Sequence, residues 1–333
     1  MTTLIKVADG EPTDDGLLDI GKDIAYDVAE EVKKRAREGK LGEFTGETGA
    51  TGDKMKSGDD IADEVVEKVI PGYLRQGIGA AYVYSEEKGV YILGKGDKGI
   101  FIIIDPLDGS NNLRVGAPHP YVSVSVALGR LSDLPGKDTF DSVRVGVVRD
   151  IFNNKTYHAV KGRGFADVYD ILDKHTTELR TYDGDPSNIR VPTEKVLEKA
   201  VVGIDLDKGK DEDPKEMEAR LEKLSGLLKD KYCQRRLGST ILDFCKVAAG
   251  EYDAFVSIGG RMRLHDLAAA KLIVEEAGGI FDFGAGPRNL VEYIFSNSDK
   301  PKEVSKVLKD STFKVVAAAN PDIYGQIRNR IGY

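Results

Sequence analysis

The run 105–112 (DPLDGSNN) holds the residues of this chain that are best suited to chemistry. It follows an apolar stretch, 99–104, and places two carboxylates, Asp105 and Asp108, three residues apart. Such carboxylates are hard oxygen ligands for divalent cations. The turn that follows them offers backbone N–H groups to an anion, and Gly109 lets a phosphate approach the main chain. The structural alternative is a Pro-containing turn in which Asp108 only caps a helix.

Three further acidic residues extend this signal, because a Mg²⁺ site needs several carboxylates and these rarely come from one loop. Glu86 ends a predicted strand just before the strand that leads to Asp105, so it is expected to point toward Asp105. Asp59 precedes one predicted helix, and Asp266 begins another. Each has a simpler explanation as well: a polar strand end for Glu86, and a helix N-cap for the two aspartates.

Spacing excludes several other chemistries. An EF-hand that began at Asp105 would end at Gly116, where a bidentate Glu is required. Haloacid-dehalogenase phosphatases space their aspartates D-x-D, whereas this chain has D-x-x-D, so the aspartyl-nucleophile geometry is not expected. The sequence contains no G-x-S-x-G elbow and no Walker A motif. Serine hydrolase and P-loop NTPase activities are therefore excluded.

The histidines and cysteines show no metal-type spacing. The histidines are expected at the surface or in turns, and they are His119, His158, His175 and His265. Among them, His265 stands out because Asp266 follows it. Cys233 and Cys245 are interpreted as small core residues rather than as a disulfide framework.

Hydrophobic periodicity predicts the elements that must position these groups. In the first half, apolar residues recur at i, i+4 and i+8 around 20–32 and over 61–70, which predicts two helices. Strands are predicted over 81–84, 90–93, 99–104, 121–128, 143–148 and 156–160. The stretch 121–128 (YVSVSVAL) alternates with period two, which predicts a half-buried strand.

The second half alternates strands and helices, an α/β signature. Strands are predicted over 200–204, 252–258 and 314–318, and helices over 216–228, 239–249 and 267–277. The turn-rich stretch 182–188 (YDGDPSN) is the best candidate boundary. We therefore expect an N-terminal α+β domain over 1–185, with most of the metal ligands, and a C-terminal α/β domain over 186–333.

Composition describes an ordinary globular chain and disfavours some partners. Of 333 residues, 41% are hydrophobic and 31% are charged, and 48 basic against 56 acidic residues give a net charge of −8. This negative charge disfavours nucleic acid as a partner, and it would also repel a phosphorylated substrate unless cations intervene, so a bound metal is worth looking for. No apolar run is long enough to span a bilayer, and the first residues lack a signal-peptide core. We therefore expect a cytoplasmic protein without a membrane partner.

Four blocks of the sequence resemble the Mg²⁺-dependent, lithium-sensitive phosphatases that include inositol monophosphatase and fructose-1,6-bisphosphatase. In chain order they are TGDKMKSGDD (51–60), SEE (85–87), IDPLDGSNN (104–112) and HDLAAAKLIVEEAGG (265–279). The resemblance extends over most of 51–330. It implies an α/β fold of the layered α/β/α/β/α sandwich type, a homodimer, and hydrolysis of a small phosphomonoester, inositol-1-phosphate and/or fructose-1,6-bisphosphate, by metal-activated water.

The resemblance also implies a role for individual residues. Two or three Mg²⁺ would be held by Glu86, Asp105, the carbonyl of Leu107, Asp108 and Asp266. Ser110, hydrogen-bonded to Asp59, would orient the attacking water and take its proton. The phosphate would be cradled by Gly109, Ser110 and Asn111. Contacts to the rest of the substrate are expected from Arg235, Gly238, Ser239, Arg261 and Arg263.

Two departures from the family pattern bear on the substrate. The usual Trp before the final Asp is His265 here, and no carboxylate occurs in 257–260, where animal inositol monophosphatases carry a substrate-contacting Glu. Inositol selectivity of the animal type is therefore not expected. The loop 259–264 (GGRMRL) is more similar to archaeal enzymes that act on both substrates. A 3′-phosphoadenosine 5′-phosphate phosphatase and a non-catalytic module that binds metal and phosphate remain as alternatives.

Overall fold

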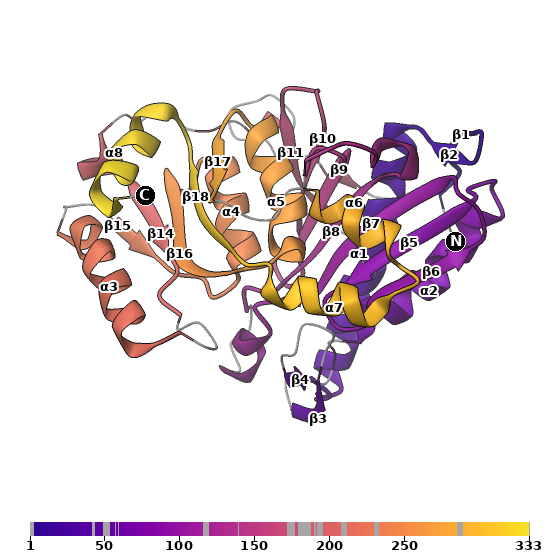
Figure 1. The fold of residues 1–333 in the computed structure, drawn as a ribbon, viewed down its shortest axis with the longest axis horizontal. Helices are drawn as coiled ribbons and strands as arrows, with labels where there is room; N and C mark the ends of the chain where they lie inside the picture. Colours follow the sequence, from indigo (N-terminus) through magenta and orange to yellow (C-terminus); the bar gives the residue numbers. More distant parts are fainter. Residues whose placement is uncertain are drawn as a thin grey trace.

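The computed structural model describes most of the chain, in the ranges 3–41, 44–48, 54–56, 58, 60–115, 120–138, 140–171, 177–178, 188–189, 191, 196–207, 212–229, 233–284 and 289–332. Helices and sheets alternate in five layers (Figure 1). The boundary expected near residue 185 lies outside the described residues, so the division into 1–185 and 186–333 stays a prediction.

The larger sheet forms the second layer. Its strands are β5 (Ala80–Ser85), β6 (Gly89–Gly94), β7 (Gly99–Asp108), β8 (Ser123–Arg130), β9 (Val145–Asp150), β10 (Lys155–Val160), β11 (Ala166–Ile171), β12 (Thr177–Glu178) and β13 (Asn188–Ile189). They are ordered β12-β11-β10-β9-β8-β7-β5-β6, and β13 also pairs with β11. Neighbours are antiparallel, except that β5 and β7 run parallel.

The smaller sheet forms the fourth layer. Its strands are β14 (Val201–Ile204), β15 (Cys233–Arg235), β16 (Ala254–Met262), β17 (Ile280–Phe283) and β18 (Phe313–Ala318), in the order β15-β14-β16-β18-β17. The first three run parallel, and β18 pairs antiparallel with both β16 and β17. Two short hairpins stand apart: β1 (Val7–Ala8) with β2 (Glu11–Pro12), and β3 (Phe44–Thr48) with β4 (Lys54–Lys56).

Helices fill the other three layers, as Figure 1 shows. The outer face of the larger sheet is covered by α1 (Asp14–Arg37) and α2 (Ile61–Leu74). Between the sheets lie α4 (Thr240–Ala248) and α5 (Leu264–Glu276), and the outer face of the smaller sheet is covered by α3 (Pro214–Leu228) and α8 (Pro321–Ile331). The remaining helical segments are η1 (Ser110–Val115), η2 (Leu131–Asp133), η3 (Leu197–Lys199), α6 (Leu290–Ser296) and α7 (Pro301–Asp310). The predicted α/β/α/β/α sandwich is confirmed.

Three hydrophobic clusters hold the layers together. One packs α1 and α2 on the larger sheet, one fills the space between the sheets, and one packs α3 and α8 on the smaller sheet. Helix α5 lies very close to β9: a Cβ added to Gly146 would lie 2.7 Å from the carbonyl oxygen of Ala269. This close approach fixes the position of α5, which carries part of the candidate site.

The expected burial is wrong for the strand over 121–128 and for Cys233, and also for His158 and His265, which are buried rather than at the surface or in turns. The strand predicted over 121–128 was expected to be half-buried, but residues 123–129 of β8 are all buried. The valines of β8 face the cluster under α1, while the small residues between them face α5, so both faces are covered. Cys233 is exposed on the edge strand β15, whereas Cys245 is buried as expected.

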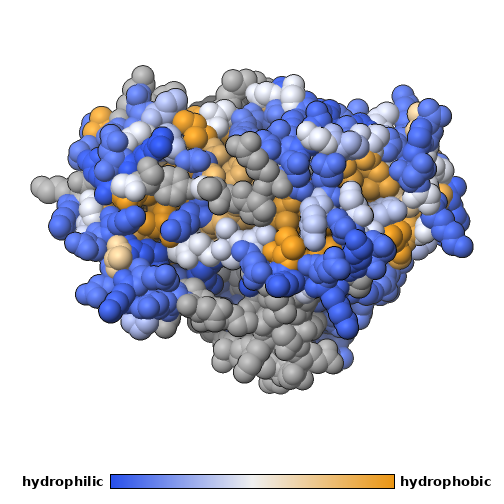
Figure 2. All heavy atoms as spheres, viewed as in Figure 1, coloured by the Kyte–Doolittle hydropathy of each residue, from blue (hydrophilic) through white to orange (hydrophobic). Residues whose placement is uncertain are grey.

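Hydrophilic residues dominate the face drawn in Figure 2, and hydrophobic atoms show through in several separate places. Among the described residues, none of the helices is long and apolar enough to cross a membrane.

His158 on β10 is expected to make stability depend on pH. Its side chain is buried, and this burial, followed by the charges of Lys22 and Arg163, lowers the pKa of the imidazole well below its usual value, although Asp167 lies 3.6 Å away. An unfolded histidine titrates at about pH 6.5, so below that pH the unfolded state binds a proton that the folded state does not. The free energy of unfolding should therefore fall by up to about 1.4 kcal/mol per pH unit as the pH decreases.

Urea unfolding above and below this pH measures the effect. His158→Gln removes the titrating group and should flatten this part of the pH dependence. Equal slopes in the two proteins would contradict the assignment.

Candidate metal centre

The register of β5 and β7 places Glu86 beside Asp105. The two strands are parallel, with Ser85 opposite Ile104, so the next residue of each follows at the same edge of the sheet. The backbone N–H of Glu86 donates to the carbonyl of Ile104 at 3.3 Å. Asp105 is 2% exposed, and its Oδ1 accepts from the backbone N–H of Leu107 at 3.0 Å.

Asp108 is held by three groups from two elements. The pairing of β7 with β8 shifts register between Asp105 and Asp108, which turns Asp108 toward α4. Its Oδ2 accepts hydrogen bonds from the Ser239 hydroxyl at 2.5 Å, the Ile241 backbone N–H at 3.0 Å and the Ser123 hydroxyl at 3.4 Å. The side chain is thus fixed in one orientation by the start of α4 and by β8.

Asp266 lies in the first turn of α5, on the opposite side of the cluster. Its Oδ2 accepts from the backbone N–H of Arg263 at 2.6 Å, so Asp266 does serve as a capping residue. Its Oδ1 lies 3.7 Å from Nε2 of His265, which in turn lies 3.6 Å from Oε1 of Glu86. The structure therefore brings acidic residues that are far apart in the sequence to one place between the sheets.

The electrostatics of this cluster favour a bound cation. Burial first, and then the negative charge of Glu86, raises the pKa of the Asp105 carboxyl well above its usual value. Burial also raises the pKa of Asp108 to about 7 and that of Asp266 to about 6. Several carboxylates that resist ionisation together need a positive charge among them, and carboxylate oxygens fit Mg²⁺. The carboxylates of the cluster thus fit the metal that the sequence predicts.

His265 belongs to this cluster, although its spacing did not indicate it. It is 2% exposed rather than at the surface or in a turn. One ligand atom each from Glu86, Asp105 and His265 lie within 4.8 Å of one another. The sequence signal that pointed to it was its position next to Asp266.

The turn after Asp108 is tight and is anchored to neighbouring segments. Gly109 has φ +83°, in the left-handed region that favours glycine, and the backbone N–H of Asn112 donates to its carbonyl at 2.8 Å. The Asn112 side chain donates to the carbonyls of Tyr121 at 2.6 Å and Leu237 at 2.9 Å. These bonds tie the turn to the segment before α4. The roles of Gly109, Ser110 and Asn111 with phosphate stay predictions.

The residues expected to contact the rest of the substrate lie in different settings. Ser239 is fully buried and donates to Asp108, so its side chain positions a carboxylate. Gly238 beside it is exposed, with φ +76°. Arg261 lies 3.3 Å from Asp207 and 3.8 Å from Asp205, while Arg235 donates to the carbonyl of Gln234 at 2.9 Å.

Arg263 precedes α5 as its N-cap, so it lies beside Asp266. Leu107 is 6% exposed, and its carbonyl as a ligand stays a prediction. Asp59, the expected partner of Ser110, lies outside the described residues. Its neighbour Asp60 is exposed and pairs with Arg35 at 3.2 Å.

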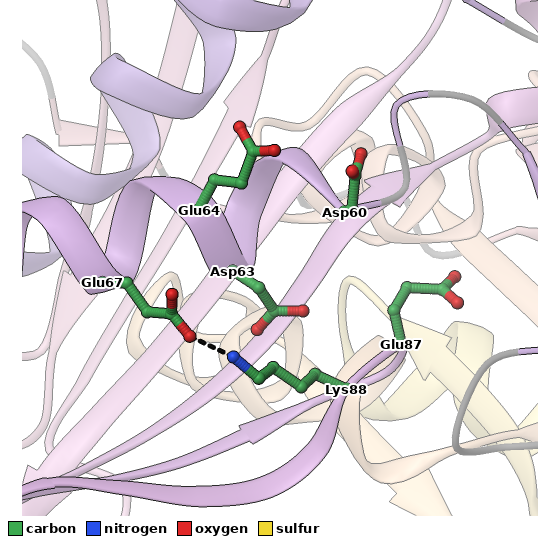
Figure 3. Close-up of a pocket in the computed structure, with 6 residues that line it drawn as sticks. All are labelled: Asp60, Asp63, Glu64, Glu67, Glu87 and Lys88. Atoms are coloured by element: carbon green, nitrogen blue, oxygen red, sulfur yellow. Dashed lines mark hydrogen bonds and ion pairs between the residues drawn. The ribbon is translucent and has the colours of Figure 1, made fainter.

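A separate pocket of about 270 Å³ lies between α2 and the β5–β6 turn. Figure 3 shows its lining residues, which are Asp60, Asp63, Glu64, Glu67, Glu87 and Lys88. The Asp63 carboxylate accepts from Ser85 and from Tyr91, each at 2.8 Å, and Lys88 pairs with Glu67. None of the predicted site residues lines this pocket, and its charges are largely satisfied within the protein.

Ser239→Ala is expected to weaken the cluster without unfolding the chain. The variant loses the hydroxyl that holds Asp108, and such outer partners of a metal ligand contribute about tenfold to a hundredfold in metal affinity or activity. Calorimetric titration with Mg²⁺ and the rate of phosphate release measure the two effects. Unchanged values for both would show that Ser239 does not position Asp108.

Comparisons with known proteins agree with this geometry. A model described as the inositol monophosphatase family matches residues 15–297. The bifunctional NADP phosphatase/NAD kinase of Methanococcus maripaludis is 30% identical over 276 residues, which are 79% of this chain and 43% of that protein. The chain thus spans less than half the length of this relative. The fructose-1,6-bisphosphatase/inositol-1-monophosphatase of Methanothermobacter thermautotrophicus is 29% identical over 264 residues, covering 78% of this chain and 82% of the relative.

A solved structure shares the fold. The extragenic suppressor protein suhB from Bartonella henselae superposes with a TM-score of 0.65 at 21% identity, covering 95% of this chain and 98% of that one. At this identity the likeness concerns the arrangement of helices and strands alone.

Proposed function

The chain belongs to the inositol monophosphatase family, whose members are phosphatases, and from this premise we propose that it hydrolyses a small sugar or polyol phosphomonoester with the help of Mg²⁺. The proposed substrates are inositol-1-phosphate and fructose-1,6-bisphosphate. The similarity to the Methanothermobacter relative supports both, because its name includes both activities.

One observation carries the proposal: carboxylates from two strand ends and one helix start converge in a buried cluster. Glu86 and Asp105 leave the same edge of the larger sheet, and Asp266 meets them from α5. The burial and the mutual repulsion that raise the pKa of Asp105 would be relieved by a cation. We propose that Glu86, Asp105, Asp108 and Asp266, with the Leu107 carbonyl, hold two or three Mg²⁺.

The chain's own residues would then divide the remaining work. Bound Mg²⁺ would offset the charge of the ester and lower the pKa of the attacking water. Gly109, Ser110 and Asn111 would present backbone N–H groups to the phosphoryl oxygens, and these hydrogen bonds strengthen as charge develops there. Ser110 and Asp59 would orient the water and accept its proton, while the P–O bond to the sugar breaks.

The rest of the substrate would lie at the carboxyl ends of the parallel strands β14, β15 and β16, where ligands of α/β sheets commonly bind. Arg235, Arg261 and Arg263 all follow or end strands at this edge. Arg261 is held by Asp205 and Asp207, so its guanidinium is oriented before a substrate arrives. These arginines, together with Gly238 and Ser239, would contact a second phosphate or the sugar.

A phosphate-release assay tests the proposal. The full chain, with Mg²⁺ and after removal of metal with a chelator, is incubated with inositol-1-phosphate, fructose-1,6-bisphosphate, 3′-phosphoadenosine 5′-phosphate and NADP. We expect metal-dependent release from at least one of the first two. Release from 3′-phosphoadenosine 5′-phosphate or NADP alone would show that the substrate is a nucleotide and would contradict the proposed substrates. Metal binding without turnover of any ester would identify a non-catalytic binding module.

The proposal includes a homodimer, which the resemblance to the family supports, and a cytoplasmic location. Light scattering of the purified chain measures the oligomeric state. The net charge of −8 disfavours nucleic acid as a partner.

A further inference from the structure

The imidazole of His265 connects the carboxylate cluster to the hydrophobic layer between the sheets. It is 2% exposed, and its two ring nitrogens lie near groups of different kinds. Nδ1 lies 3.0 Å from the hydroxyl of Tyr84, which is itself fully buried in β5. Nε2 lies on the other side of the ring, 3.6 Å from Oε1 of Glu86 and 3.7 Å from Oδ1 of Asp266.

The two distances from Nε2 are too long for hydrogen bonds but suit atoms that share a cation. An N–H···O bond spans about 2.7–3.2 Å. Two ligand atoms at a tetrahedral angle, each about 2.1 Å from one ion, lie about 3.4 Å apart. In the described part of the chain, Glu86, Asp105 and His265 each offer one ligand atom to such a site, all within 4.8 Å of one another.

We propose that Nε2 of His265 is a metal ligand, and that the site therefore binds a transition-metal ion such as Mn²⁺ or Zn²⁺ in addition to Mg²⁺. This inference rests on the proposed function only in taking the carboxylate cluster as a metal site. Imidazole nitrogen suits Zn²⁺ and its neighbours in the first transition row, whereas Mg²⁺ prefers oxygen ligands and retains several waters.

The contact with Tyr84 is compatible with the tautomer that this role requires, because a phenol oxygen can accept a hydrogen bond from Nδ1–H. A metal-bound histidine keeps its proton on the other nitrogen and donates it to a fixed acceptor. With the proton on Nδ1, His265 donates to the Tyr84 oxygen, and the lone pair of Nε2 faces Glu86 and Asp266. Tyr84 is then a positioning residue that acts through His265.

This feature distinguishes the chain from the family pattern described above, which has Trp at this position. An indole N–H is a donor only and cannot ligate a metal. A Trp at this position would leave the site with oxygen ligands alone, and such a site favours Mg²⁺. The exchange to His adds a nitrogen without removing any of the four carboxylates.

The test compares metal binding by the full chain with that of His265→Gln, whose amide oxygen offers a hard ligand of similar reach. Calorimetric titration of the metal-free proteins with Mg²⁺, Mn²⁺ and Zn²⁺ should show that the substitution weakens Mn²⁺ and Zn²⁺ by about tenfold or more, the scale of even an outer partner of a ligand. Mg²⁺ affinity should change much less. His158→Gln, which removes another buried histidine away from the cluster, is the matched control and should change none of the three.

Electron spin echo spectroscopy of the Mn²⁺-loaded proteins gives a second measurement that does not depend on activity. We expect a nitrogen coupling from a directly bound imidazole in the wild type and in His158→Gln, and no such coupling in His265→Gln. Tyr84→Phe should retain the coupling but weaken Mn²⁺ binding, because the ring loses its acceptor.

The spectrum of the wild type alone decides the matter, even if His265→Gln fails to fold. Mn²⁺ bound without nitrogen coupling, or a parallel loss of all three metals in His265→Gln, would overturn the inference. Nitrogen coupling in a protein that releases no phosphate from any ester would uphold it while refuting the proposed function. Phosphate release by a protein without the coupling would support the proposed function and refute the ligand role of His265.

Discussion

Replacing Asp105 by asparagine should lower the rate of phosphate release by about a thousandfold or more, equivalent to ~4 kcal/mol of activation free energy. The substitution keeps the shape of the side chain but removes one negative charge from the centre of the cluster. Asp105 is the carboxylate that lies beside Glu86 at the edge of the larger sheet, and its pKa is raised by burial and then by Glu86. A metal held there would lose a charged ligand.

The same variant should fold at least as stably as the wild type when metal is absent, because one source of repulsion in a buried cluster is removed. Urea unfolding with a chelator measures this, alongside the release assay with Mg²⁺. Glu87→Gln is the matched control: it removes a carboxylate one residue from Glu86, in the separate acidic pocket, and should leave the rate unchanged. A rate for Asp105→Asn within tenfold of the wild type would contradict the ligand role of Asp105.

Gly109→Ala should reduce phosphate release by more than about a hundredfold, the effect of losing an aligned donor to a developing oxyanion. The new Cβ would lie 2.7 Å from the carbonyl oxygen of Tyr121 and 2.9 Å from Cβ of Ser239. Both neighbours are part of the framework around Asp108, so the turn must move to relieve the contacts. Its backbone N–H groups would then no longer point toward the phosphate.

Gly162→Ala separates this effect from simple backbone strain. Gly162 has the same φ of +83°, but a Cβ there would meet nothing within 4 Å. Both variants should lose about 1–2 kcal/mol of unfolding free energy from the left-handed backbone. Only Gly109→Ala should lose more unfolding free energy than this, and only Gly109→Ala should lose phosphate release. Wild-type phosphate release by Gly109→Ala would refute the cradle.

Sequence patterns predict the order of layers well because each layer is encoded locally. The strands over 81–84 and 99–104 are correctly predicted, and their parallel pairing brings Glu86 to Asp105. Periodicity also gives the helices α1, α2 and α5, whose apolar faces have to be covered by the sheets. Local sequence thus contains most of the information that determines the fold.

What the sequence does not reveal depends on contacts between distant segments. His265 is buried because Tyr84 and Glu86, some 180 residues earlier, form the other wall of its environment. Ser239 binds Asp108 across a separation of 131 residues. Neither contact has a periodic or spaced signature, so a histidine near an aspartate is indistinguishable from a surface pair until the layers are stacked.

Helix α5 touches both sheets and bears Asp266 and His265 in its first turn, whereas Glu86 and Asp105 belong to the larger sheet. The distances between these groups therefore depend on how closely α5 packs on the larger sheet. Gly146, which has no side chain, permits the close approach of α5 to β9. An extra methyl group beneath this helix would therefore lower the activity of a protein that still folds.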